Sequence, residues 1–223
     1  MNPTNLATAA DALIRAGRRL GIRRLISAGE GNLSVRLDAD RLLVTPSGRR
    51  KDELEFDDLV VVWLGHKERE TLSRSGLRPT SDLAIHLAVH DARPDVGAVA
   101  HAHLPASLAL TLASELPDPA ALPETALLLP RLPFVPLLAP GSAELAGRVV
   151  SALTEMPEPL ATAVLLERHG AIALGTDPAE AVDRLELVEV LCRTWRDALL
   201  IRAAHTALGI VSAPSPGSQP EGA

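Results

Sequence analysis

The sequence predicts a single α/β domain. Segments with the alternating or β-branched composition of strands are interleaved with segments whose apolar residues recur at helical spacing. The chain has 223 residues, of which 47% are hydrophobic and 22% charged, and this is enough to bury a substantial core. No internal repeat or linker divides residues 1–211. Residues 212–223 are rich in Pro, Gly and Ser, and we expect them to be a disordered tail.

A helix is predicted at the start of the chain. Thr4 or Asn5 can cap it, and it is expected to run to about Arg19 and to end at Gly21. Strands are predicted next, over 32–37, 41–48 and 59–64, with turns over 29–32 and 38–40 and a polar loop or short hairpin over 66–78.

Four further helices are predicted from their end signals. Thr80 or Ser81 can cap a helix that Arg93 and Pro94 stop. The others are a helix over 106–112 opened by Pro105, a helix over 143–153 capped by Ser142, and the longest helix, from Asp177-Pro178 to about His205. The segments between them are a buried strand over 96–104, a hairpin-like pair of strands over 161–175, and loops with one or two short strands over 115–141.

Composition and charge exclude several classes of partner. The formal net charge of −6 gives no extended basic surface for nucleic acid, and no apolar run reaches the roughly 18–20 residues of a membrane span. The first residues lack the charged and apolar regions of a signal peptide, and the single cysteine, Cys192, suits a reducing compartment. We therefore expect a cytoplasmic protein without nucleic-acid or membrane partners.

Two absences limit the chemistry. The chain has no tyrosine that could serve as a phenolic proton donor, and both lysines, Lys51 and Lys67, lie in polar, loop-like sequence. A lysine that forms an imine needs a desolvated setting that lowers its pKa. We therefore expect carbonyl chemistry to depend on a metal ion.

The segment VGAVAHAHL, residues 96–104, predicts a metal site. His101 and His103 are two residues apart at the end of a strand, so their side chains project from the same face. His169 follows a second apolar run, and three histidines with one open position are typical of a catalytic zinc site. An alternative set, Asp82, His86 and His90, shares one helix face at spacing i, i+4, i+8, where His86 can also hydrogen-bond back to Asp82.

Two glycine-containing turns and one helix start are candidates for binding an anion or moving a proton. The turns over 29–32 and 45–48 have the composition of anion nests, although ordinary hairpin turns share it. Asp82 lies in the first turn of the predicted helix, where loops meet a pocket, and is the candidate active-site carboxylate.

Five motifs in this order resemble the class II aldolase/adducin family over roughly residues 5–205. They are Gly31-Asn32 with Ser34 and Arg36, then TPSG at 45–48, PTSD at 79–82, ARPDVGAVAHAH at 92–103, and LLERHG at 165–170. The resemblance implies a three-layer α/β/α sandwich with a mixed, largely antiparallel sheet, and a homotetramer. It also implies zinc, or another divalent metal, on His101, His103 and His169, and a phosphate pocket formed by Gly31, Asn32, Ser47, Gly48, Thr80 and Ser81.

The resemblance implies a zinc-dependent aldolase-type lyase. Such an enzyme would cleave or rearrange a small phosphorylated ketose through an enediolate that the metal stabilises, with Asp82 as acid/base. Two departures bear on the reaction: the family's usual glutamate is replaced by Asp82, and its tyrosine proton donors are absent. The same site could instead serve an epimerase, a dehydratase or a decarboxylase. A non-catalytic adducin-like interaction module is a further alternative.

Overall fold

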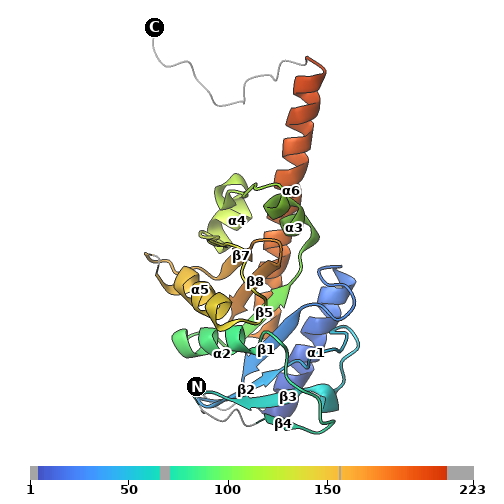
Figure 1. Cartoon of the computed structure of the whole chain (residues 1–223), viewed down its shortest axis with the longest axis vertical. Coiled ribbons are helices and arrows are strands. Elements are labelled where there is room, and N and C mark those ends of the chain that lie inside the picture. Colours follow the sequence, from blue (N-terminus) through green and yellow to red (C-terminus); the bar gives the residue numbers. More distant parts are fainter. Residues whose placement is uncertain (1–4, 66–70, 156, 210–223) are drawn as a thin grey trace.

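A computed structural model of the chain describes residues 5–65, 71–155 and 157–209. At its centre lies a sheet of eight strands (Figure 1). The strand order is β4-β3-β2-β1-β5-β8-β7-β6. Neighbouring strands are antiparallel, except that β6 and β7 are parallel. The strands are β1 (Asn32–Arg36), β2 (Arg41–Val44), β3 (Val60–Trp63), β4 (Thr71–Ser73), β5 (Ala98–Ala102), β6 (Phe134–Val135), β7 (Ala163–Leu166) and β8 (Gly170–Gly175).

Helices cover both faces of the sheet, so the molecule has three layers (Figure 1). One face shares its core with α1, α3 and α6, and the other packs against α2 and α5. This confirms the predicted α/β/α sandwich with a mixed, largely antiparallel sheet. The helices are α1 (Leu6–Ile22), α2 (Leu83–Ala92), α3 (Pro105–Leu112), α4 (Pro123–Leu128), α5 (Ala143–Thr154) and α6 (Pro178–Ala207), with short 3-10 helices over Phe56–Asp58 and Pro119–Ala121.

Strand β5 shows how the two cores are separated. Ala98, Ala100 and Ala102 belong to the core beneath α1 and α6, whereas Val99 belongs to the core beneath α2 and α5. Because side chains alternate along a strand, His101 points to the same face as Val99. The sheet therefore directs His101 toward the α2 side of the molecule.

Two segments differ from the prediction. Helix α1 continues to Ile22, because Gly21 serves close packing rather than termination: a Cβ there would lie 2.6 Å from the Cβ of Asp52. Residues 115–141 contain the short strand β6 but also the helix α4, in which Pro123 occupies the first turn, where proline is tolerated.

One predicted cap is wrong: α2 begins at Leu83 with Asp82 as its N-cap residue, not Thr80 or Ser81. Other predicted caps agree with the structure. Asn5 caps α1, Ser142 caps α5 and Asp177 caps α6. Part of the polar segment 66–78 forms β4, which pairs with β3 as in a hairpin. Thr4, residues 66–70 and the predicted tail lie outside the described residues. None of the helices in the described part of the chain has the length and apolar character that a membrane crossing requires.

Replacing Gly17 should destabilise the fold, although alanine is normally favoured over glycine in a helix by about 1 kcal/mol. Gly17 lies in α1, and a Cβ there would lie 2.1 Å from the carbonyl oxygen of Lys51. We expect Gly17→Ala to lower the free energy of unfolding by about 1–3 kcal/mol, measured by urea denaturation.

Gly147→Ala is the matched control, because no atom lies within 4 Å of the Cβ position of Gly147 in α5. This variant should be neutral or more stable by up to about 1 kcal/mol. A Gly17→Ala protein as stable as the control would show that α1 does not pack closely against the backbone of Lys51.

Candidate active site

Three histidines meet at one end of the central strands. His101 lies in β5, His103 follows two residues later, and His169 lies in the turn between β7 and β8. Their ring centroids are 5.0, 4.8 and 5.0 Å apart, and one nitrogen of each ring lies within 4.8 Å of the others. The three side chains predicted to hold a metal are therefore close enough to share one ion.

The turn that carries His169 depends on a glycine. Gly170 has φ +106°, and a Cβ at this position would lie 2.1 Å from the carbonyl oxygen of Ala102. Glycine alone permits both this backbone conformation and such a close approach. The turn can therefore rest against the end of β5, and His169 comes to lie beside His103.

The histidine cluster fits a divalent cation. His101 Nδ1 lies 2.9 Å from the carbonyl oxygen of Ala171, so Nδ1 carries the proton and Nε2 keeps its lone pair. That Nε2 is buried without a hydrogen-bond partner in the described structure. Burial lowers the pKa of His101 to about 3 and also lowers the pKa of His169. Both rings are thus neutral near pH 7, which is the state that binds a metal.

The candidate acid/base, Asp82, faces this cluster. It is 6% exposed, and its Oδ2 lies 4.0 Å from Nε2 of His101 and accepts a 2.8 Å hydrogen bond from Nδ2 of Asn32. Burial opposes ionisation of Asp82 and the hydrogen bond from Asn32 favours it; the pKa of this carboxyl group lies below its usual value. Asp82 is therefore a carboxylate at neutral pH.

The local position of Asp82 differs from the prediction in two respects. Asp82 is the N-cap residue of α2 rather than a member of its first turn, and its side chain does not cap the helix. Instead, the N–H of Asp82 donates to Oγ1 of Thr80 at 3.3 Å, and the carboxylate remains turned toward the site. The expected hydrogen bond from His86 back to Asp82 is wrong, because His86 Nε2 contacts Oδ1 of Asn32 at 2.6 Å.

A cavity of about 280 Å³ adjoins Asp82, His103 and His169. Three segments form it: the turn over 29–32, the turn over 46–48, and the residues before α2. Backbone hydrogen bonds from Ser47 to Arg78 (3.0 Å) and from Thr80 to Thr45 (3.1 Å) join the second and third segments. All six residues predicted to bind phosphate line this cavity: Gly31, Asn32, Ser47, Gly48, Thr80 and Ser81.

Sequence reasoning missed two residues of this cavity, Lys51 and Glu30. Lys51 was expected in a solvated loop but is 2% exposed; its Nζ donates to the carbonyl oxygens of Gly29 (2.7 Å) and Arg49 (2.6 Å), and burial lowers its pKa. Glu30 Oε1 lies 3.5 Å from Nδ1 of His103. No local pattern indicates the burial of Lys51, because the residue packs against α1, which is distant in sequence.

The alternative metal site on the face of α2 is not formed. His86 Nδ1 and His90 Nε2 lie 2.7 and 2.9 Å from the hydroxyl of Ser34. These ring nitrogens are engaged in internal hydrogen bonds within the described structure, so Asp82, His86 and His90 do not present a common set of open ligands.

A larger cavity of about 510 Å³ lies between α1 and the start of α6, away from these side chains. Two of its arginines are already neutralised: Arg15 pairs with Asp11, and Arg19 pairs with Asp183 and Glu186. This cavity therefore offers less for catalysis than the smaller one beside Asp82.

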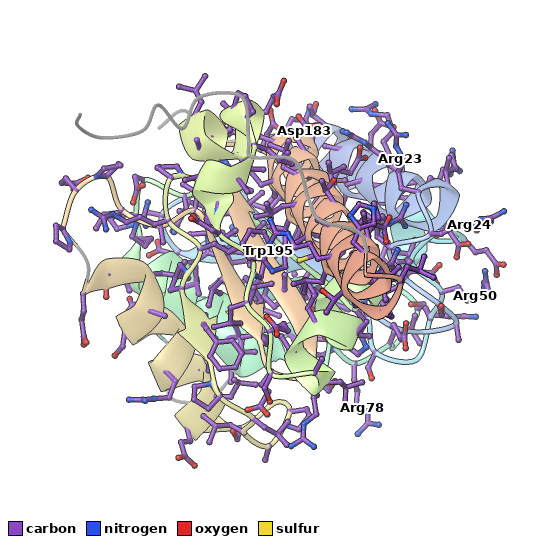
Figure 2. The ribbon with its side chains drawn as sticks, turned by 90° about the horizontal axis from the view of Figure 1, so that it is seen from above. Arg23, Arg24, Arg50, Arg78, Asp183 and Trp195 are labelled. Carbon is purple, nitrogen blue, oxygen red and sulfur yellow. The ribbon has the colours of Figure 1, made fainter. Side chains whose placement is uncertain are left out.

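Four further arginines lie toward the edge of the molecule, three of them on the right of Figure 2 and Arg78 below them. They are Arg23, Arg24, Arg50 and Arg78, and none of them lines the cavity beside Asp82. The phosphate pocket predicted here thus depends on hydroxyl and backbone groups rather than on these side chains.

Comparisons with known proteins agree with this arrangement. A family model described as "Class II Aldolase and Adducin N-terminal domain" matches residues 11–196. A 3-oxo-tetronate 4-phosphate decarboxylase of Haemophilus influenzae is 32% identical over 184 residues, which cover 80% of this chain and 82% of that protein. The solved structure of a sugar-phosphate aldolase from Thermotoga maritima has a TM-score of 0.77 and 27% identity, covering 93% of this chain and 98% of that one.

A third relative matches over a shorter length. A methylthioribulose-1-phosphate dehydratase of Acidiphilium cryptum is 40% identical over 112 residues, 50% of this chain, so the match spans about half of that relative (51%). The relatives thus carry names for three different reactions.

The buried histidines predict a loss of stability in mild acid. Burial lowers the pKa of His86 to about 4 and that of His90 well below 6.5, whereas both titrate near pH 6.5 in the unfolded chain. The unfolded state therefore binds more protons below about pH 6.5, and the free energy of unfolding should fall by about 1.4 kcal/mol per pH unit for each ring that stays neutral in the folded state, which for His86 holds down to about pH 4.

Urea denaturation of the metal-free protein at several pH values measures this effect. Acidic residues contribute in the same direction, so His90→Gln is the comparison: it should reduce the pH dependence by up to one proton, whatever its effect on absolute stability. Equal pH dependences for the two proteins would contradict a neutral, buried His90.

Proposed function

This chain belongs to the class II aldolase and adducin N-terminal domain family, and we propose that it is a metal-dependent carbon–carbon lyase. Its substrate would be a small phosphorylated ketose or a related hydroxy-carbonyl compound. One observation carries the proposal: a three-histidine cluster, a buried carboxylate and a cavity lined by two glycine turns converge at one place.

The histidines would bind the metal ion, which would act as the electrophile. His101, His103 and His169 would hold zinc or another divalent ion, which, when bound, polarises substrate oxygens and offsets the negative charge that develops beside the carbonyl group. The Ala171 carbonyl fixes the ring of His101 for this role.

The glycine turns and the start of α2 would bind the phosphate. Gly31 and Gly48 have positive φ values of 72° and 73°, a conformation in which consecutive N–H groups form an anion-binding concavity. Ser47, Thr80 and Ser81 add hydroxyl groups, and the N-terminus of α2 adds its dipole. Binding the phosphate at this distance from the reacting carbons orients the substrate.

Asp82 would transfer the protons. It is ionised at neutral pH and lies beside the histidine cluster. It can therefore accept a proton from a substrate hydroxyl and give a proton to the carbon whose carbon–carbon bond has been cleaved. Cleavage by loss of a carboxylate group needs less proton transfer than aldol cleavage, because an ionised carboxylate has no hydroxyl proton to lose before it leaves as carbon dioxide. The absence of tyrosine and the decarboxylase relative both favour this variant as the second candidate.

We also propose that the protein is a cytoplasmic homo-oligomer, most simply a tetramer. The C-terminal part of α6 extends beyond the body of the molecule (Figure 1), and apolar side chains on it and on nearby helices are exposed. These are Leu112, Leu127, Leu128, Leu200 and Ile201. An exposed apolar set of this kind is typical of a subunit interface.

Metal content is the first test of the proposal. Elemental analysis of untagged protein should find close to one divalent ion per chain, and a His101/His103/His169→Ala variant should lose it. His205→Ala, in the last turn of α6, is the control and should keep the metal. Metal-free wild type after incubation with zinc would refute the enzyme and favour the interaction module.

The reaction is tested with a panel of substrates. We expect release of a carbon fragment from a ketose phosphate or a 3-oxo-acid phosphate, and much weaker activity on the dephosphorylated compounds. Asp82→Asn should lower kcat at least about 100-fold while the metal stays bound, and Asp82→Glu should recover part of the activity. Loss of water from methylthioribulose 1-phosphate, without carbon–carbon cleavage of any compound, would establish a dehydratase instead.

A further inference from the structure

Two polar stripes face each other between β1 and α2. Asn32, Ser34 and Arg36 alternate along β1, so they project from the same face as His101, the register partner of Asn32. Asp82, His86 and His90 recur every four residues at the start of α2 and along it. Two residues of a strand span about 6.6 Å and four residues of a helix about 6 Å, so the two stripes nearly match in spacing.

The two stripes are joined by an unbroken series of hydrogen bonds. Starting from Asp82, its Oδ2 lies 2.8 Å from Nδ2 of Asn32, and Oδ1 of Asn32 lies 2.6 Å from Nε2 of His86. The hydroxyl of Ser34 lies 2.7 Å from Nδ1 of His86 and 2.9 Å from Nε2 of His90. Nδ1 of His90 lies 3.3 Å from Nη2 of Arg36. The four inner residues, Asn32, Ser34, His86 and His90, are at most 4% exposed, so water does not compete with these bonds.

The carboxylate end of the series determines its direction. A carboxylate can only accept, so Asn32 must turn its amide nitrogen to Asp82 and its oxygen to His86. His86 must then donate from Nε2. At the other end, Nη2 of Arg36 donates to the backbone carbonyl oxygen of His90 at 2.5 Å, and it can also donate to Nδ1 of His90 when that nitrogen carries no proton.

The Ser34 hydroxyl connects the two halves. Because His86 donates from Nε2, its Nδ1 can only accept, and Ser34 must give it the one hydroxyl proton. The oxygen of Ser34 then accepts from Nε2 of His90, which leaves Nδ1 of His90 without a proton. Nδ1 of His86 is free to accept because burial lowers the pKa of His86 to about 4 and leaves its ring neutral. Every donor in the series therefore points toward Asp82.

We propose that Arg36, His90, Ser34, His86 and Asn32 form a one-directional hydrogen-bond chain that orients the Asp82 carboxylate toward the histidine cluster, with Ser34 as its central link. They are positioning residues: Arg36, Ser34, His86 and His90 do not line the cavity, and Asn32, which does, acts here by holding the carboxylate. The catalytic consequence rests on the proposed function, whereas the direction of the chain does not depend on it.

The direction is measured directly by nitrogen NMR of protein labelled with ¹⁵N-histidine, near neutral pH and without metal. Both His86 and His90 should be neutral and protonated at Nε2, with signals assigned through His86→Gln and His90→Gln variants. A ring that is protonated at Nδ1, or at both nitrogens, would overturn the proposal. This outcome is independent of whether any substrate is found.

Ser34→Ala tests whether the chain acts on Asp82. Without the hydroxyl, the Nδ1 signal of His86 should move toward that of a ring nitrogen without a hydrogen bond, and kcat should fall by about 10- to 100-fold with KM changed less than about threefold. Asp82 would still be present but less firmly oriented. The bound metal should be unchanged.

Ser107→Ala is the matched control, because Ser107 is 1% exposed on α3 and donates to the carbonyl oxygen of Leu104 outside the chain. It should leave kcat and both histidine signals unchanged. Equal kcat values for Ser34→Ala and wild type, or equal losses in the two serine variants, would overturn the positioning role.

Discussion

The backbone pairing of β1 with β5 is the constraint on which the site depends. Their register places Asn32 opposite His101, so the amide that holds the carboxylate and the histidine proposed as a metal ligand are neighbours on one face of the sheet. A slip of β1 by one residue would turn Asn32 to the opposite face, into the core beneath α1 and α6, and would separate it from His101. The glycine turn at Gly170 then brings His169 to the same place, since no larger residue could approach β5 so closely.

Burying polar groups in the centre of a sheet is unfavourable unless each finds a partner. Here the cost is offset because the strand and helix repeats nearly coincide, and each polar side chain on β1 meets one on α2. The same face is otherwise apolar, with Val99 and Ile172 packed against Ile85 and Val89. Apolar packing therefore determines the distance between α2 and the sheet, and the hydrogen-bond chain determines how α2 is aligned along β1.

The sequence predicted those parts of the fold and site that local patterns determine. The stop of α2 at Arg93 and Pro94, the end signals of α3, α5 and α6, and the i, i+2 spacing of His101 and His103 depend on neighbouring residues alone. Burial of Lys51, continuation of α1 past Gly21, and the partners of His86 depend on segments distant in sequence. A pattern that places Asp82, His86 and His90 on one helix face reports their common direction correctly. It does not report that β1 supplies a serine and an asparagine to meet them.

The shorter carboxylate is the feature that this architecture best explains. An aspartate has one methylene fewer than a glutamate, so it has fewer rotamers with which to reach a substrate, and its position is determined largely by the backbone of residue 82. That backbone is held by the hydroxyl of Thr80, whose own N–H is tied to Thr45. The carboxylate is held from the other side by Asn32, so its two anchors lie on different elements, the segment before α2 and strand β1. A short side chain that is held at two points has a shorter reach, and its carboxylate occupies a narrower range of positions. The narrower range favours proton transfer, because a displacement of about 1 Å costs on the order of a hundredfold in rate.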